Sequence, residues 1–422
     1  MNVKKLWPIL ILLGITVIYL LGTSAVPFHP DEATQIYMSA DWETLFHHPG
    51  DLFYSLTPAD PVRQNYRLLD APLTRWLIGA GRSLAGVAAL PVDWDWSKPW
   101  QQNEQAGALP GNTLLLVSRL SVAWLFGISL WFIYRAGCIL KGPWMGWTGV
   151  ALAALNALVL MHTRRAMAES ALFCAVCWVI YVLAKKETHP ILLALPAALA
   201  VNAKQTAAGL VLVVLLAAWI YPQGLAWPKR LRNTCLCAIF ILLATYLLNP
   251  VAWKAPLSAA RAAVEVRSEL ATRQIETLAA VSPERVMRTP VQRATGWLGY
   301  LFFTPPATAD VANYVTDTQT AEANYFSNPL NNLLRSVAGG MVLLAISLAG
   351  FLLAGFRTLR NIREQPSLGL LLAATLIPFF SLILFIPLPF QRYGIILVPF
   401  VNLWMAAILT ELIRIFIKNR EA

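Results

Sequence analysis

Charged residues are scarce in this sequence. Asp, Glu, Lys and Arg make up 13% of its 422 residues, whereas about 25% is usual in soluble domains. Hydrophobic residues reach 57%, against about 45–50% in soluble domains. These proportions exclude an ordinary water-soluble enzyme and indicate a membrane protein. The net charge of +11 does not indicate a nucleic-acid partner, because the basic residues are divided among short clusters and form no single patch.

None of the five cysteines lies in a long polar segment, so no disulfide framework is indicated. Cys174 and Cys177 have the CxxC spacing of redox sites, but they lie inside an apolar run, which favours helix packing for both. The chain also lacks a clustered set of metal ligands, and no metal or other cofactor is expected. His29 beside Asp31 is the one position that leaves a metal site open.

Long apolar runs are numerous, and each is a candidate for crossing a hydrocarbon core of about 30 Å. The candidate spans lie near 6–26, 113–134, 144–161, 171–183, 191–201, 207–221, 234–248, 337–356, 368–386 and 395–413. The sequence therefore predicts an all-α polytopic membrane protein with a bundle of about ten transmembrane helices. The first run also has features of a signal peptide, but its apolar length exceeds the usual range of about 7–15 residues, which favours an uncleaved anchor.

Basic residues in short loops indicate which end of the bundle is cytoplasmic. If the spans alternate, one face receives Lys4–Lys5, Arg135 with Lys141, Lys185–Lys186, Lys229–Arg230–Arg232, Arg357–Arg360–Arg363 and Arg414–Lys418–Arg420. The sequence therefore predicts a multi-pass protein of the inner (plasma) membrane with both termini in the cytoplasm.

Two long polar segments face outward in this topology, residues 27–112 and 251–332. They divide the chain into a transmembrane module over 1–250 that includes the first outer loop, a second outer loop over 251–332, and C-terminal transmembrane helices over 333–422. Loops of this length between packed spans are usually functional. Residues 72–85 predict a short amphipathic helix of the kind that lies along the membrane interface. Residues 256–280 predict another amphipathic helix, either a solvated cap over the bundle or a binding element.

An acidic pair, Asp31 and Glu32, follows the first span directly. Two adjacent carboxylates at a membrane surface are disfavoured by the low-dielectric core and by each other's charge. One explanation is that they cap a following helix, with Pro30 at its start. The other is a general base at the membrane edge, which would deprotonate a substrate hydroxyl.

Cations also gather at predicted outward turns. Arg164, Arg165 and Glu169 lie in a tight hairpin between the third and fourth spans, where a structural Arg165–Glu169 pair and a phosphate-binding role are both plausible. Lys204 joins the fifth and sixth spans, and Arg392 precedes the last span. Either of these two taken alone could simply reach toward lipid headgroups. Together they suit transfer of a group from a lipid phosphate, since cations neutralise the charge that grows on a departing phosphate.

The order of these segments resembles that of a known family. The acidic pair after a first span is followed by DAPLTRWLIGAGR, then VSRLSVAWLFGISLWFIYRAG, then HTRRAMAES and finally QRYGIILVPF. This arrangement resembles the GT-C superfamily of membrane glycosyltransferases, and is similar to the protein O-mannosyltransferases and the lipid A aminoarabinose transferase. The resemblance runs from about residue 6 to residue 399 and is strongest over the first seven spans.

The resemblance implies a GT-C-like bundle with interfacial helices in the first large outer loop. It also implies an enzyme whose donor is a polyprenyl-phosphate-linked sugar, which it transfers on the extracytoplasmic side to a glycan, lipid or protein acceptor. Asp31 would be the catalytic base and Glu32 its neighbour in catalysis. The remaining implied site residues are Arg164, Arg165, Lys204 and Arg392 at the donor phosphate, with His29, Asp70, Arg75, Glu169 and Tyr393 as substrate-binding or supporting groups.

One departure from the family concerns position 34. The aminoarabinose transferases commonly have Arg three residues after the catalytic Asp, whereas this chain has Thr34. Arg164, Lys204 and Arg392 are therefore the stronger candidates for the cation at the donor phosphate. The rival hypothesis is a flippase or transporter of lipid-linked saccharides, but such a protein should carry charges deep within several spans or show related halves.

Overall fold

The computed structural model of the protein describes residues 3–222, 224–309, 314–361 and 364–421. Every element assigned within these ranges is a helix. A helix satisfies its own backbone hydrogen bonds, which is required of a segment surrounded by lipid. The predicted all-α architecture is confirmed for this part of the chain.

Six helices are long and apolar enough to cross a membrane. They are Asn112–Lys141, formed by α7 (Asn112–Ala123) and α8 (Leu125–Lys141), then α11 (Ala168–Lys185), α14 (Trp227–Leu248), α18 (Val337–Arg360), α19 (Pro366–Phe385) and Gln391–Asn419, formed by η8 (Gln391–Leu397) and the greater part of α20 (Val398–Glu421). Three shorter apolar helices are Leu6–Leu21 within α1 (Val3–Leu21), α12 (Pro190–Ala203), and Gln205–Ile220, formed by η2 (Gln205–Ala207) and α13 (Ala208–Ile220). The chain is thus consistent with a multi-pass membrane protein, while the count of about ten spans stays a prediction.

The predicted span at 144–161 is interrupted. It consists of two helices, α9 (Pro143–Ala154) and α10 (Ala157–His162). Asn156 separates them, and its side-chain oxygen accepts the backbone N–H groups of Leu158 and Val159 at 3.0 and 3.4 Å. Asparagine favours such a capping position over a helix interior because its side chain competes for backbone hydrogen bonds. The helix therefore restarts at this residue instead of running through.

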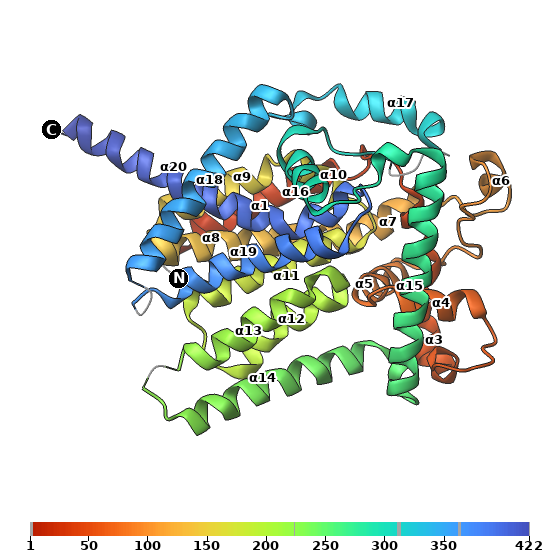
Figure 1. Ribbon diagram of the computed structural model, residues 1–422. Coiled ribbons are helices and arrows are strands. Elements are labelled where there is room, and N and C mark those ends of the chain that lie inside the picture. The colour runs from red at the N-terminus through yellow and green to blue at the C-terminus, as the bar shows by residue number, and fades with distance from the viewer. Residues whose placement is uncertain (1–2, 223, 310–313, 362–363, 422) are drawn as a thin grey trace.

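The two polar segments fold into a series of mostly short helices and one long helix. The first contains α2 (Pro30–Met38), α3 (Asp41–His47), η1 (Pro49–Leu52), α4 (Pro61–Leu69), α5 (Leu73–Leu84) and α6 (Trp100–Gln105). The second contains η3 (Pro250–Ala252), α15 (Pro256–Val281), η4 (Pro283–Arg285), α16 (Pro290–Leu298), η5 (Gly299–Phe303), α17 (Val315–Phe326) and η7 (Pro329–Asn332). The long helix, α15, lies with α3, α4 and α6 at the right of Figure 1. The helices predicted at 72–85 and 256–280 are confirmed as α5 and α15.

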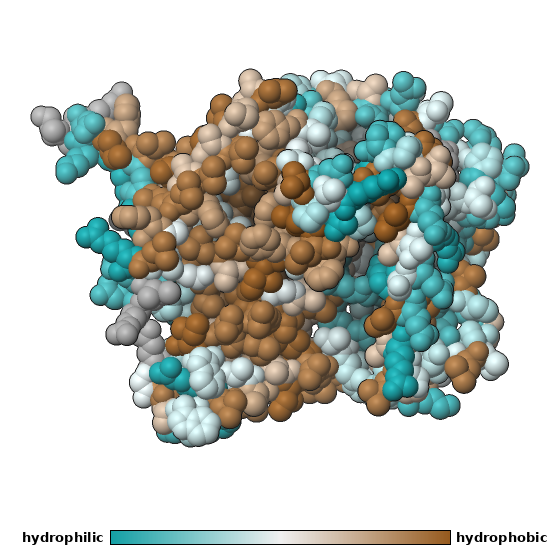
Figure 2. Space-filling view, in the orientation of Figure 1, coloured by the Kyte–Doolittle hydropathy of each residue, from teal (hydrophilic) through white to brown (hydrophobic). Residues whose placement is uncertain are grey.

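Hydrophilic residues gather toward both ends of the bundle, and apolar residues lie between them (Figure 2). Figure 2 shows apolar residues over the faces of the long helices and hydrophilic residues along α15 at the right of the view. Both chain ends lie at the left of Figure 1, away from α15. Of the basic residues predicted to face the cytoplasm, Arg363 lies outside the described residues. Three of the others, Lys141, Lys185 and Arg357, lie in the last turns of α8, α11 and α18, respectively.

Close helix packing at Gly350 yields the first testable prediction. A Cβ atom added to Gly350 in α18 would lie 2.0 Å from the backbone oxygen of Trp404 in α20. At Gly355 in the same helix, a Cβ would meet nothing within 4 Å.

We expect Gly350→Ala to lower the free energy of unfolding by about 1–3 kcal/mol, because the two helix backbones must move apart. Gly355→Ala is the matched control and should be neutral or slightly stabilising, since alanine is the better helix former. Denaturation in mixed micelles measures both values. Equal losses at the two positions would contradict the close approach of α18 and α20.

Candidate functional site

The acidic pair lies in the first turn of α2. His29 is the N-cap residue, and its Nδ1 accepts the backbone N–H of Asp31 at 3.1 Å. The Glu32 carboxylate in turn accepts the backbone N–H of His29 at 3.1 Å. This reciprocal arrangement is a capping box, and Pro30 occupies the first helical position, where a missing N–H is tolerated. The capping interpretation is confirmed for Glu32, while Asp31 is left with a carboxylate that takes no part in the cap.

Glu32 is fully buried and paired with Arg119 of α7. Arg119 donates through Nε and Nη2 to the two Glu32 oxygens at 2.7 and 2.8 Å. Ala166 adds its backbone N–H to Glu32 at 2.8 Å. Burial opposes ionisation of Glu32, but the charge and hydrogen bonds of Arg119, with further help from Arg165 and the Ala166 N–H, hold its pKa below the ordinary value. Glu32 is therefore a buried anchor.

Arg119 also ties α7 to the end of the first helix. Its Nη1 donates to the backbone oxygens of Thr23 and Val26 at 3.0 and 2.8 Å. A single bidentate pair thus joins the segment after α1, the start of α2, α7 and the turn before α11. Bidentate geometry of this kind adds directional specificity to charge attraction.

Asp31 faces a different set of groups. Its carboxylate forms an ion pair with Arg392 of η8, and the side chains are 30% and 11% exposed, respectively. The neighbouring Tyr393 ring lies 4.3 Å from the Nζ of Lys204. Lys204 donates to Glu169 of α11 at 2.5 Å. The structure therefore brings three predicted turns together at one end of the bundle.

Asp70 belongs to the same cluster. Its side chain accepts from Gln35 of α2 at 3.5 Å. Burial raises the pKa of Asp70, and the negative charge of Asp31 raises it further, whereas Arg267, Arg75 and Arg392 act in the opposite direction. Two carboxyl groups close enough to influence each other are a common arrangement for acid–base chemistry.

Arg75 contacts the neighbouring polar network. Its Nε lies 3.5 Å from the Asp41 carboxylate, and its side chain is 2% exposed. Arg67 donates to the same carboxylate at 2.7 Å. At Arg75, the basic face of the amphipathic helix α5 therefore points into the protein. The location of α5 along the membrane interface stays a prediction.

Arg164 and Arg165 come from the turn before α11 and contact the end of α1 and the residues that follow it. Arg164 donates to the backbone oxygen of Tyr19 at 3.0 Å, and its guanidinium carbon lies 4.7 Å from the Tyr19 ring centre. Arg165 donates to the backbone oxygens of Pro27 and Thr308 at 3.2 and 2.7 Å. The structural alternative for this hairpin paired Arg165 with Glu169, but Glu169 forms its ion pair with Lys204.

The second outer loop reaches the start of α2 through His29. The Nε2 of His29 lies 3.0 Å from the hydroxyl of Tyr314. Trp96 from the first outer loop completes this aromatic group, with ring centres 6.5 Å from His29 and 5.9 Å from Tyr314. Among the described residues, no three His, Cys, Asp or Glu side chains gather in a way that could hold a metal ion. The expectations about metal and cofactors stay predictions.

Sequence reasoning missed Arg119 and the Asp93–Tyr66 pair. Arg119 carried a usable signal, because an arginine inside an apolar span normally has a buried partner. Asp93 accepts the Tyr66 hydroxyl at 2.6 Å in the first outer loop, and burial raises the pKa of Asp93. No local pattern identifies that pair, because its two members are brought together only by the folded loop.

Comparison with known proteins supports the fold. No protein-family model and no curated protein sequence matches the chain. The structure of the archaeal oligosaccharyltransferase AglB from Archaeoglobus fulgidus, in complex with an inhibitory peptide and a dolichol-phosphate, is similar with a TM-score of 0.53 and 13% identity, over 100% of this chain and 52% of that chain. The oligosaccharyltransferase from the same organism in complex with Zn and sulfate gives 0.50 and 12%, over 95% and 49%.

These matches define the fold class. The chain shares the fold of these archaeal oligosaccharyltransferases, which is consistent with the GT-C-like bundle expected from the sequence, and its acidic and basic candidate site lies at one end of the helical bundle. It spans about half the length of the solved structures that it matches.

The Glu32–Arg119 pair leads to a prediction about stability. We expect Arg119→Met to lower the free energy of unfolding by about 3–5 kcal/mol, because it leaves the Glu32 charge buried without its partner. The double variant Glu32→Gln/Arg119→Met should lose less than Arg119→Met alone. Denaturation in mixed micelles measures the cycle, and strictly additive losses would show that the two side chains act independently.

The raised pKa of Asp70 leads to a prediction about pH. Ionisation is harder in the folded than in the unfolded chain, so wild type should lose stability relative to Asp70→Asn as the pH rises above the ordinary value of 3.8. Asp95 is the control, because hydrogen bonds from the Ser97 hydroxyl and N–H lower its pKa to about 2. Wild type should therefore gain stability relative to Asp95→Asn as the pH rises toward 3.8. Unfolding midpoints measured against pH test both signs, and parallel curves for Asp70→Asn and wild type would contradict the prediction.

Proposed function

We propose that the protein is a glycosyltransferase that moves a sugar from a polyprenyl-phosphate donor to an acceptor hydroxyl. The observation that carries the proposal is the Asp31 carboxylate, which is partly exposed and lies beside Arg392 at the end of the bundle where the polar loops gather. Lys204 stands in the same cluster. An accessible carboxylate with adjacent cations matches the needs of a reaction that removes a proton and releases a phosphate.

Asp31 acts as the general base in this proposal. One of its oxygens takes the proton from the acceptor hydroxyl, and the acceptor oxygen attacks the anomeric carbon of the sugar. The bond from that carbon to the phosphate oxygen breaks, and polyprenyl phosphate leaves with the bonding electrons. A single displacement of this kind inverts the configuration at the anomeric carbon.

Arg392 and Lys204 stabilise the departing phosphate. Arginine presents a planar fork that matches phosphate oxygens, and lysine provides a compact charge. A bound donor phosphate would compete with Asp31 for Arg392, which would free the carboxylate for the acceptor proton. Glu169 holds Lys204 in place, and Tyr393 covers its ammonium group.

The other predicted site residues take positioning roles in this proposal. Glu32 and His29 fix the turn that carries Asp31. Arg164 braces the last turn of α1, and Arg165 braces the segment between α1 and α2, against the hairpin before α11. Asp70, just after α4, lies close enough to Asp31 to feel its charge and stands at the approach for the acceptor, whereas Arg75 of α5 is buried behind it against Asp41.

The fold supports a lipid-phosphate donor. The similar AglB structure contains a dolichol-phosphate together with an inhibitory peptide. The site of the present chain lies at the end of the bundle opposite its basic helix ends, which the positive-inside rule assigns to the extracytoplasmic side of the plasma membrane. We propose a glycan, lipid or protein hydroxyl there as the acceptor.

The role of Asp31 is tested with purified protein in vesicles that contain a polyprenyl-phosphate sugar. Asp31→Asn should lower the transfer rate by about 10²- to 10⁴-fold, the usual contribution of a positioned general base. Glu104→Gln is the matched control, since it removes an exposed carboxylate from the same outer loop, and it should transfer at the wild-type rate. Release of free polyprenyl phosphate and labelled product measures the reaction.

Two results would overturn the proposal. An Asp31→Asn protein that transfers sugar at the wild-type rate would remove Asp31 from the chemistry. Movement of intact donor across the vesicle membrane, without release of polyprenyl phosphate, would identify a transporter.

A further inference from the structure

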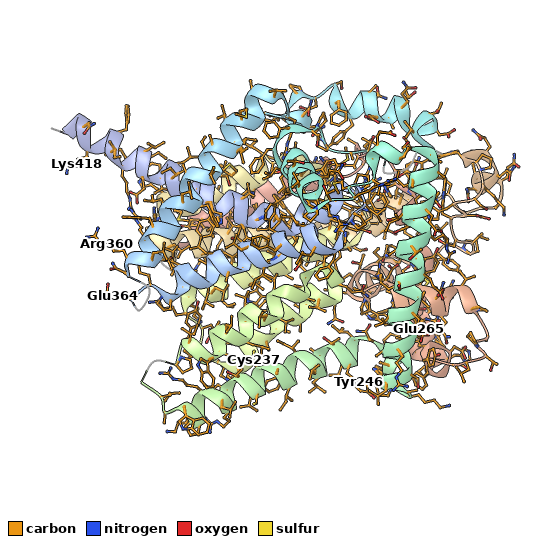
Figure 3. The ribbon with its side chains drawn as sticks, viewed as in Figure 1. Cys237, Tyr246, Glu265, Arg360, Glu364 and Lys418 are labelled. Atoms are coloured by element: carbon orange, nitrogen blue, oxygen red, sulfur yellow. The ribbon has the colours of Figure 1, made fainter. Side chains whose placement is uncertain are left out.

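A cavity of about 1040 Å³ lies at the end of the bundle away from Asp31. It opens between the ends of α8, α11, α18 and α19 and the side of α20. Helix α11 separates the two regions, because Glu169 is in its first turn and Lys186, just past its last turn, lines the cavity. Eighteen helical residues span about 27 Å. Figure 3 shows Arg360 and Glu364 at the opposite end from Glu265 of α15.

The lining of this cavity is rich in positive charge. Its basic residues are Lys141, Lys186, Arg357, Arg360 and Arg414, and its acidic residues are Glu364 and Glu411. Glu411 accepts from Lys141 at 2.8 Å and from Arg357 at 3.0 Å. One carboxylate is thus shared by two cations, and the lining keeps a surplus of positive charge.

Two of these cations have no partner in the part of the chain that the structure describes. No hydrogen bond or ion pair there involves the side chain of Lys186 or Arg360. Lys186 also has a φ of 56°, in the left-handed region. Glycine commonly occupies such a helix end, because the left-handed conformation costs other residues about 1–2 kcal/mol. A lysine is held there at the expense of backbone stability.

Helix ends do not cancel this charge. The C-termini of α8, α11 and α18 each contribute about half a negative charge. The N-terminus of α19 contributes a positive one, and its first turn has no side-chain cap. Ser367 from that turn lines the cavity. The cavity therefore attracts an anion.

The rim of the cavity is apolar and faces outward. Ile139 of α8 and Phe356 of α18 both line it, and they are 42% and 63% exposed. Exposed apolar residues on helices long enough to cross a membrane are suited to contact with acyl chains. A ligand that fits this combination has an anionic head and apolar tails.

We propose that this cavity binds the phosphate headgroup of an anionic phospholipid. The phosphate accepts from Lys186 and Arg360, and the acyl chains lie against Ile139 and Phe356. Basic pockets between transmembrane helices recognise such headgroups. The site is separate from the proposed glycosyl transfer and does not depend on it.

The experiment uses the full chain in phosphatidylcholine nanodiscs with increasing phosphatidylglycerol, and measures the unfolding midpoint and the lipid retained in native mass spectrometry. Lys186→Gln/Arg360→Gln should weaken phosphatidylglycerol binding roughly 30-fold, since each cation near a membrane contributes a factor of about five. The control Lys185→Gln/Lys418→Gln removes the same charge from residues that are exposed like Lys186 and Arg360 but do not line the cavity, and it should bind like wild type.

Three results would overturn the proposal. The control pair could lose as much affinity as the cavity pair, which would show a general effect of surface charge. The cavity pair could bind phosphatidylglycerol like wild type. Inorganic phosphate alone could raise the midpoint as much as phosphatidylglycerol, which would identify a free-phosphate site. If the cavity pair unfolds in phosphatidylcholine, Arg360→Gln alone carries the test, with an expected loss of about fivefold.

Discussion

The buried pair of Glu32 and Arg119 is the contact on which the geometry of the candidate site depends. Removing two charges from water is unfavourable unless their hydrogen bonds are nearly all made, and here they are. Arg119 reaches two backbone oxygens as well as Glu32, and Glu32 accepts from two backbone N–H groups. The charges therefore specify one arrangement of four chain segments. Asp31 inherits its position from that arrangement.

Asp31 and Glu32 lie in the same helical turn but have different surroundings. Successive helical residues point about 100° apart, so Glu32 enters the protein while Asp31 remains 30% exposed beside Arg392. The anchor and the reactive group are thus separated by a single peptide bond. The groups around Asp31 come from η8 and from the segment between α12 and η2, which meet only in the folded bundle.

Much of the fold could be predicted, because apolar length and amphipathic spacing act locally. Helices α5 and α15 and the tight turn before Glu169 follow from such patterns. The partner of Glu169 could not be predicted, since the i,i+4 spacing indicates Arg165 and only tertiary structure supplies Lys204. The break at Asn156 depends on one capping side chain within an otherwise continuous apolar run. The sequence predicts that Arg164, Arg165, Lys204 and Arg392 lie at one end of the bundle. Only the tertiary structure separates Arg392 and Lys204, in the cluster with Asp31, from Arg164 and Arg165, which contact α1 and the residues after it.

The imidazole of His29 fixes which atom donates the hydrogen bond between the two outer loops. A backbone N–H can only donate, so Nδ1 must be the acceptor for Asp31, and the proton of the neutral ring is then on Nε2. That nitrogen therefore donates to the hydroxyl of Tyr314, which lies 285 positions later in the chain. Position 29 requires a rigid side chain with an acceptor near its own backbone and a donor at its far edge. A neutral histidine meets both requirements, and its ring links the hydroxyl of Tyr314 in the second loop to the amide of Asp31.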